Sequence, residues 1–366
     1  MEPVFSTKAD LYKAYTQHSI ENSIKVASYC LFDQVFEDMN MALYQPRKDQ
    51  CDKCCEYKVG NITPEEYNEH IELKDAARQS KSDDKERCSS DPAVKVLTMD
   101  LQAVLICPRL QASAIYYKTK LACHNFTVMD LSNKDTTCYV WNESEGDLSA
   151  SSFASCTVDY IENMIKSSDD VKEIIIYSDG CTYQNRNAVL ANALLKTAVD
   201  HDITIEQKYL ERGHTQMEVD SIHSLVERKL KRKPIYVPQN YVDVIASCRQ
   251  SRPIDVKYVL HSFFKDMKKL NMYNSIRPGS RVGDPTVTNL RVLRYSPDGT
   301  IQYKLGFGDH FKDFPRKSKG PNDVEDVSQL HLNRIPIKAS KFKHLQELKS
   351  VIPSDYHAFY DSLPHD

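Results

Sequence analysis

Residues 171–180 read Val-Lys-Glu-Ile-Ile-Ile-Tyr-Ser-Asp-Gly. The apolar, β-branched part of this run predicts a short buried strand in a partly parallel sheet. The turn-forming residues Ser178, Asp179 and Gly180 end the run, so Asp179 is expected at the carboxyl end of that strand. The chain therefore places an acidic side chain where a buried sheet reaches its edge.

Periodic runs on both sides of this strand predict an α/β core. The expected elements, in chain order, are strands over 94–101, 123–130 and 136–141, a helix over 151–168, the strand at 171–177, a helix over 184–199, a strand over 203–209 and a helix over 216–230. This order, βββαβαβα, contains a βαβ unit and predicts a mixed sheet flanked by helices.

The last predicted helix carries three polar side chains on one face. Asp220, His223 and Glu227 stand at i, i+3 and i+7, beside an apolar row of Val219, Ile222 and Val226. One face of the helix is therefore expected to pack against the sheet, and the neighbouring face to carry chemistry.

Asp100 is an acid inside the otherwise apolar strand pattern of residues 94–101. Burying a lone carboxylate is costly unless a partner compensates its charge. A divalent cation shared with Asp179 and a third acid would do so, because Mg²⁺ and Mn²⁺ take oxygen ligands. We expect Asp220 as the third acid, while Glu218 and Glu227 stay open as alternatives.

A second metal site is predicted upstream. Cys51 and Cys54 form a C-x-x-C pattern that can give Zn²⁺ two thiolates from one turn, and His70, on the following helix, is a third ligand. The fourth ligand is open among Cys88, Cys55 and Cys30. The alternative is a set of reduced thiols with no metal.

The organisation of the chain follows from these patterns. Residues 1–92 are expected to be a helical region with the zinc knuckle, including a helix over 12–42 and a solvated helix over 72–90 that leads into a linker. Residues 93–250 are the expected core. Residues 251–366 are an expected α+β extension, with a helix over 256–270, a hairpin over 292–305 and short helices over 340–349 and 354–363.

Charge is unevenly distributed along the chain, although the net charge is only -3. Residues 212–270 carry 12 Lys and Arg against 6 Asp and Glu, whereas residues 1–92 carry 12 against 18. The basic excess follows the acidic helix and could contact phosphates or act as a nuclear address. The alternative is a solvated helix end with favourable dipole contacts. The basic side chains concerned are Lys229, Lys231, Arg232 and Lys233.

Composition sets the class of protein. A hydrophobic fraction of 41% without a long apolar run predicts a non-membrane protein. The N-terminal residues lack the pattern of a secretory signal, and eleven cysteines then indicate a reducing, intracellular compartment.

Five short blocks carry a resemblance to a known family. They are Thr-Met-Asp-Leu-Gln at 98–102, Tyr-Ser-Asp-Gly-Cys-Thr-Tyr-Gln-Asn-Arg-Asn at 177–187, Gly-His-Thr-Gln-Met-Glu-Val-Asp at 213–220, the knuckle at 46–54 and Ile-Pro-Ser-Asp-Tyr at 352–356. They resemble an uncharacterised transposon-derived family that is widespread in animal genomes. The element order and the acids also resemble the RNase H-like superfamily, whose carboxylates on strand one, strand four and the last helix bind two metal ions.

The resemblance implies a DDE/D-type transposase or a domesticated relative, in the nucleus, that cleaves and joins DNA phosphodiesters with Mg²⁺ or Mn²⁺ and could act as a homo-oligomer. His214 or His223 could then shuttle a proton, or instead make a helix-start hydrogen bond. Arg186 could hold a phosphate at the start of a helix, or be an ordinary polar residue there. Two other functions stay open: an inactive DNA-binding scaffold, and a nuclease or junction resolvase with the same site.

Overall fold

The computed structural model describes residues 7–39, 41, 43, 51–168, 170–231, 233–314 and 327–366. The chain divides into two compact units, residues 1–63 and residues 64–366. Among the residues that the model describes, no helix combines the length and the apolar character that a bilayer crossing needs.

The described residues of the first unit form the helices α1 (Lys8–Glu21), α2 (Tyr29–Asp38) and α3 (Asp52–Lys58). The single helix expected over 12–42 is therefore two helices. The break falls after Glu21, where Ser23 adopts a positive φ of 55° and Ser28 caps the next helix by accepting from the Leu31 N–H. Aromatic contacts of Tyr12 with Phe32 hold α1 against α2.

The second unit is built on a ten-stranded sheet with the order β10-β9-β8-β6-β5-β1-β3-β4-β7, and β2 pairs with β3 beside this path. Its strands are β1 (Val94–Leu101), β2 (Leu105–Cys107), β3 (Leu121–Asp130), β4 (Thr136–Asn142), β5 (Glu173–Ser178), β6 (Thr204–Tyr209), β7 (Asp255–Tyr258), β8 (Val292–Tyr295), β9 (Ile301–Lys304) and β10 (Lys312–Asp313). The expected α/β class with a mixed sheet is confirmed. β1 lies parallel to β5 and antiparallel to β3, β5 lies parallel to β6, and β3 lies antiparallel to β4.

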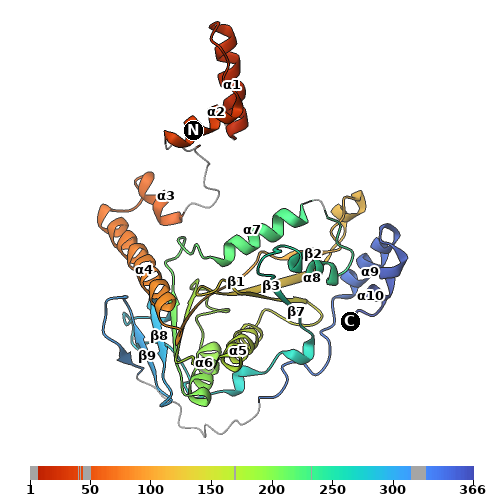
Figure 1. Cartoon of the computed structure of the whole chain (residues 1–366). Coiled ribbons are helices and arrows are strands. Elements are labelled where there is room, and N and C mark those ends of the chain that lie inside the picture. The colour runs from red at the N-terminus through yellow and green to blue at the C-terminus, as the bar shows by residue number, and fades with distance from the viewer. Residues whose placement is uncertain are drawn as a thin grey trace. The chain divides into compact units, whose positions relative to one another are not determined.

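Helices cover both faces of this sheet (Figure 1). One face packs on α5 (Ala150–Ser167) and α6 (Ala188–His201), and the other packs on α4 (Pro64–Ser90), α7 (Val219–Leu230), α8 (Gln239–Ala246), α9 (Ala339–Leu348) and α10 (His357–Asp361). Neighbouring residues of β1 divide between the two cores: Val96 belongs to the α7 side and Leu97 to the α5 side. Because both faces are buried, β1 and β5 are apolar over nearly their whole length.

The segment after residue 250 belongs to the same sheet. A helix was expected over 256–270, but the structure has β7 followed by short 3-10 turns, because residues 255–258 pair in parallel with β4. The expected hairpin is present as β8 and β9. The boundaries expected after residues 92 and 250 both lie inside the second unit, since α4 and β7–β10 pack on or extend the sheet.

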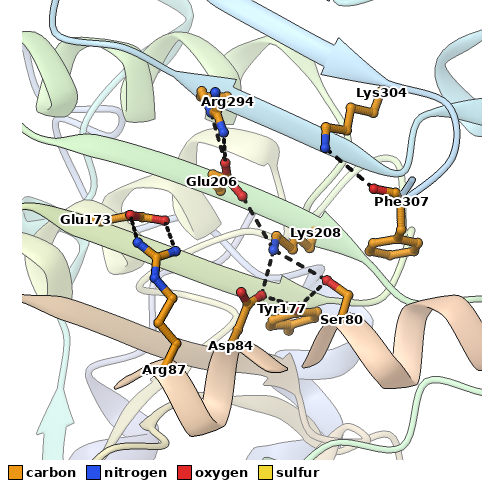
Figure 2. Close-up of polar contacts among 10 residues, drawn as sticks. All are labelled: Ser80, Asp84, Arg87, Glu173, Tyr177, Glu206, Lys208, Arg294, Lys304 and Phe307. Atoms are coloured by element: carbon orange, nitrogen blue, oxygen red, sulfur yellow. Dashed lines mark hydrogen bonds and ion pairs between the residues drawn. The ribbon is translucent and has the colours of Figure 1, made fainter. Parts of the chain in front are cut away.

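Buried ion pairs join α4 to the sheet, although a solvated helix tapering into a linker was expected here (Figure 2). Lys208 on β6 lies 2.6 Å from Asp84 on α4 and 3.4 Å from Glu206, which in turn binds Arg294 on β8 at 2.7 Å. Tyr177 donates to the same Asp84 carboxylate. Lys208, Asp84 and Glu206 are each less than a tenth exposed. These contacts fix α4 against β5 and β6.

Removing the shared cation should therefore destabilise the fold. We expect Lys208→Met to lower the free energy of unfolding by about 3–5 kcal/mol, because it leaves the buried Asp84 carboxylate without its cation, whereas Glu206 keeps Arg294. Arg87→Met is the matched control: the Arg87 side chain is 47% exposed in its pair with Glu173, and the loss should be about 1 kcal/mol or less. Urea unfolding measures both variants, and equal losses would contradict this role of Lys208.

Candidate metal centre

Asp100 lies on the central strand and on the face that α7 covers. It shares this face with Val94 and Val96, which alternate with it along β1 and belong to the core beneath α7. Thr98 pairs with Tyr177 of β5, so Asp100 stands two residues beyond that pair on one strand and Asp179 two residues beyond it on the other. Both acids therefore lie at the carboxyl ends of neighbouring parallel strands, at the same edge of the sheet.

Asp179 is held by the loop that follows β5. Its Oδ1 atom accepts from the Cys181 N–H at 3.1 Å and from Nδ2 of Asn185 at 2.7 Å. Asn187 then caps α6 by accepting from the Leu190 N–H at 2.9 Å. The turn residues after β5 thus fix one carboxylate oxygen and leave the other for a ligand.

The first turn of α7 supplies the next two groups. Asp220 accepts from the Met217 N–H at 2.8 Å through Oδ2. The ligand atoms of Asp100, Asp220 and His223 all lie within 4.8 Å of one another. Nε2 of His223 lies 3.1 Å from Oγ1 of Thr127, which is the residue paired with Asp100 on β3. One more strand therefore orients the imidazole toward the acids.

The electrostatics of this cluster disfavour negative charge. Burial, with Asp179 and Asp220 nearby, raises the pKa of Asp100 to about 7. Burial also raises the pKa of Asp220, against the opposing effects of the Met217 N–H and Lys81. Burial lowers the pKa of His223 to about 4, so the imidazole is neutral near pH 7. A cation between the carboxylates would relieve this repulsion, and the residues present fit a divalent ion.

The other two candidates for the third acid face elsewhere. Glu218 pairs with Lys81 at 3.1 Å and with Lys85 at 3.5 Å on α4. Glu227 is exposed and stands seven residues beyond Asp220, roughly 10 Å along the helix. Asp220 is therefore the helix acid that the structure brings to Asp100.

Within the described residues of the second unit, Asp100, Asp220 and His223 form a group of side chains that could bind a metal ion. In the second unit, Nε2 of His70 lies 3.2 Å from Nε2 of His214, and Nδ1 of His70 lies 3.1 Å from Oε1 of Glu211. In the first unit, Cys51 is the residue before α3 and Cys54 lies in its first turn.

Cys88, one of the residues left open as the fourth zinc ligand, lies far from His70. Cys88 lies on α4 with His70 but 18 residues further on, roughly 27 Å along the helix, so the two cannot share an ion. The Cys88 thiol is buried and donates to the Lys85 carbonyl at 3.2 Å. His214, predicted as a proton shuttle, instead faces His70. Burial lowers the pKa of the His214 imidazole, and the nearby His70 lowers it further.

The predicted phosphate contacts divide into two places. Arg186 is 5% exposed and lines a cavity of about 580 Å³ beside Asp179. Lys229, Lys231 and Lys233 are exposed, and the latter two line a separate cavity with Arg109. Arg232 lies outside the described residues, as do residues 46–50 of the predicted knuckle.

Two residues of these sites were not predicted. Thr127 sits in a strand pattern that gives no sign of a polar role, and its contact with His223 follows only from the pairing of β3 with β1. Glu211 follows β6 and binds both His70 and Arg291. The position of Glu211, a charged residue directly after a buried strand, is the sequence feature that could have indicated its role.

Comparison with known proteins gives one match. A family model for a domain of unknown function, DUF8701, matches residues 111–269, which is less than half of the chain. This span includes Asp179, Arg186 and Asp220 but neither Asp100 nor the cysteine pair. No curated protein and no solved structure matches the chain.

Because the pKa of Asp100 is raised, Asp100→Asn should increase the free energy of unfolding by an amount that depends on pH. Because the folded pKa of about 7 lies above the usual value of 3.8, the folded protein binds a proton more tightly than the unfolded chain between these values, and wild-type stability falls as pH rises through that window. The gain should be absent below about pH 4 and reach at most roughly 4 kcal/mol above pH 7. Unfolding without divalent ions, followed from pH 4 to pH 8, measures it.

Added Mg²⁺ or Mn²⁺ provides the second half of this test. The ion should raise the melting temperature of the wild type at pH 8, because it binds the folded state, and should have little effect on Asp100→Asn. A variant that is less stable than the wild type at pH 8 would show that Asp100 has a purely structural role.

Proposed function

We propose that the second unit is an RNase H-like enzyme that cleaves, and in a transposase-like reaction joins, DNA phosphodiesters with the help of divalent metal ions. The observation that carries this proposal is the close approach of Asp100 and Asp220, which lie within 4.8 Å with His223, while Asp179 is near enough to raise the pKa of Asp100. Like charges raise the free energy of a partly buried cluster, and such an arrangement is typical of a cation site.

The order of the strands supports the same proposal. The path β4-β3-β1-β5-β6, with its first two pairings antiparallel and its last two parallel, is the arrangement expected for an RNase H-like sheet. α5, α6 and α7 follow β4, β5 and β6 in the predicted βββαβαβα order. In this proposal the acids stand on strand one, after strand four and on the last helix.

Each side chain would have a distinct task. Divalent ions bound here would activate water or a 3′-hydroxyl and stabilise the leaving oxygen. Asp100 and Asp220 would hold oxygen ligands on the α7 face, while Asp179, fixed by Asn185, would present its second oxygen from the neighbouring strand. His223, neutral near pH 7 and hydrogen-bonded through Thr127, would orient or ligate rather than carry charge.

Asp179→Asn tests the enzymatic proposal. With Mg²⁺ or Mn²⁺ present, nicking of labelled DNA should fall at least about 100-fold, since even partners of metal ligands are worth about 10–100-fold. Glu227→Gln is the matched control, because Glu227 lies on α7 but faces solvent, and it should keep its activity. DNA binding should persist in both variants. A wild type as inert as Asp179→Asn, with DNA still bound, would favour the scaffold alternative.

We also propose, from the residue types in the sequence, that Cys51, Cys54 and His70 bind a structural Zn²⁺, and that His214, which lies beside His70 within the second unit, is the fourth ligand. Two thiolates and two imidazoles are a common zinc ligand set. Glu211 supports this assignment within the second unit, since its carboxylate accepts from Nδ1 of His70 and leaves Nε2 to ligate. The close approach of the two Nε2 atoms places both imidazoles where one ion could bind them.

Zinc content distinguishes this ligand set from the one expected on sequence alone. Purified His214→Ala and Cys54→Ser should hold less than half of the wild-type zinc by plasma mass spectrometry. Cys88→Ser should keep the full content, because Cys88 lies far along α4 and its thiol is already hydrogen-bonded. Equal zinc loss in Cys88→Ser and His214→Ala would contradict the assignment.

A further inference from the structure

A cavity of about 580 Å³ lies at the carboxyl ends of β5 and β6, directly beside Asp179. Its walls come from the loop at 179–183, from the loop at 210–215 and from Arg186, Thr288 and Arg291. The volume falls within the range of about 300–1,000 Å³ that is usual for small-ligand pockets. A ligand bound in this cavity would therefore lie next to Asp179 of the proposed metal centre.

Arg186 is unusual among the arginines of this cavity because it is buried without a counter-ion. Its side chain is 5% exposed, Nη1 donates to the Thr288 carbonyl at 2.7 Å, and Nε has no hydrogen-bond partner. Among the described residues no carboxylate forms an ion pair with Arg186, whereas Arg291 pairs with Glu211 at 2.8 Å. Among the described residues, Asp179 and Glu211 therefore attract the charge of Arg186 only at longer range, without a direct ion pair.

Such an arrangement costs stability unless a ligand compensates it. An uncompensated buried charge is unfavourable, and a guanidinium is suited to hold phosphate oxygens through several donors. The Arg186 guanidinium lies over the Tyr209 ring, with its carbon 4.4 Å from the ring centroid. This cation–π contact restricts the orientation of the guanidinium. These contacts position the Arg186 side chain, but none of them is an ion pair. An anion bound in the cavity could form that ion pair.

Gly180 makes room for this guanidinium. A Cβ atom at Gly180 would lie 2.3 Å from Nη2 of Arg186 and 2.8 Å from its Cζ atom. The glycine next to Asp179 therefore allows Arg186 to reach the loop that carries the acid. The close packing ties the proposed anion contact to the proposed metal ligand at the same strand end.

Tyr183 adds an apolar surface to the cavity. Its side chain is 52% exposed although it lines the cavity, and its hydroxyl accepts from Nε2 of Gln184 at 3.1 Å. The same ring lies 6.2 Å from the ring of Phe153, measured between centroids, so one side is supported by the core. An exposed, supported aromatic ring is suited to stack on an unpaired base.

We propose that this cavity receives one unpaired nucleotide of the nucleic-acid strand, with its phosphate on Arg186 and its base on Tyr183. This inference rests on the proposed function, since it names the part of the substrate that lies beside Asp179. A base engaged in a duplex could not reach Tyr183 without leaving its stack, so the site favours a single-stranded or splayed strand.

Binding of a labelled single strand, without added divalent ions or chelators, tests the proposal while the zinc site stays loaded. Arg186→Met should weaken binding about tenfold and reduce the slope of log affinity against log salt by about 0.7, the value for one lost phosphate contact on a single strand. Its melting temperature should equal or exceed that of the wild type, because a buried charge without a direct ion pair is removed. Arg87→Met, the same charge change on α4, where Arg87 pairs with Glu173, should leave affinity within twofold.

Tyr183→Ala separates a nucleotide from a phosphate alone. This variant changes an exposed side chain, so it should fold, and it should weaken single-strand binding about fivefold or more while leaving duplex binding unchanged. Competition by inorganic phosphate should be equal in the wild type and Tyr183→Ala. Equal single-strand affinity of the wild type, Arg186→Met and Tyr183→Ala would overturn the proposal. A lower melting temperature of Arg186→Met with unchanged binding would likewise assign Arg186 a structural role.

The outcomes of the two proposals are separable. The binding assay contains no divalent ion and measures no cleavage, so it reports on the cavity alone. Loss of cleavage in Asp179→Asn together with normal binding by Arg186→Met would refute only the nucleotide site. Normal cleavage by Asp179→Asn would refute the proposed enzyme, whatever the binding result.

Discussion

The partial burial of Asp100 on the central strand of a sheet covered on both faces is the constraint on which the rest of the structure depends. Two parallel neighbours, β1 and β5, end at the same edge, and strict alternation along β1 directs Asp100 to the α7 side. A shift of one residue in the pairing would turn the carboxylate toward α5. The apolar residues of β1 specify its pairing register with β3 and β5. This register therefore determines whether Asp100 lies near Asp220.

That register has to be held by contacts far from the acids. On the same face, α4 is fixed to β5 and β6 by Asp84 and Lys208, with Glu206 and Arg294 extending the ion pairs across β6 and β8. Buried ion pairs contribute little net stability compared with apolar packing, but they penalise any arrangement that leaves one partner alone. These ion pairs between α4 and the sheet thus specify one placement of the helix. The same helix carries His70 toward His214, so its placement also matters for the proposed zinc ligands.

Much of this architecture was predictable from local patterns, because β-branched runs and helical spacing reflect burial directly. Strand and helix order in the core, and the positions of Asp100, Asp179 and Asp220, follow from such patterns. The failures have physical causes. The helix expected over 256–270 is β7 and turns because pairing with β4 outweighs local spacing. Cys88 was a reasonable zinc ligand by residue type, but it lies 18 residues beyond His70 on one continuous helix, and residue type alone does not measure that separation.

The strand edge at Asp179 concentrates charge that the fold itself does not neutralise. On one side, Asp100 and Asp220 repel additional negative charge, and on the other Arg186 is buried without a carboxylate partner. Direct pairing of Arg186 with Asp179 would be the simple solution for stability, yet Asp179 accepts from Asn185 and Cys181 instead. Keeping opposite charges adjacent but unpaired costs free energy, which the two apolar cores must offset. In the proposed function, a phosphodiester held by divalent ions would supply the cation for the acids and the anion for Arg186.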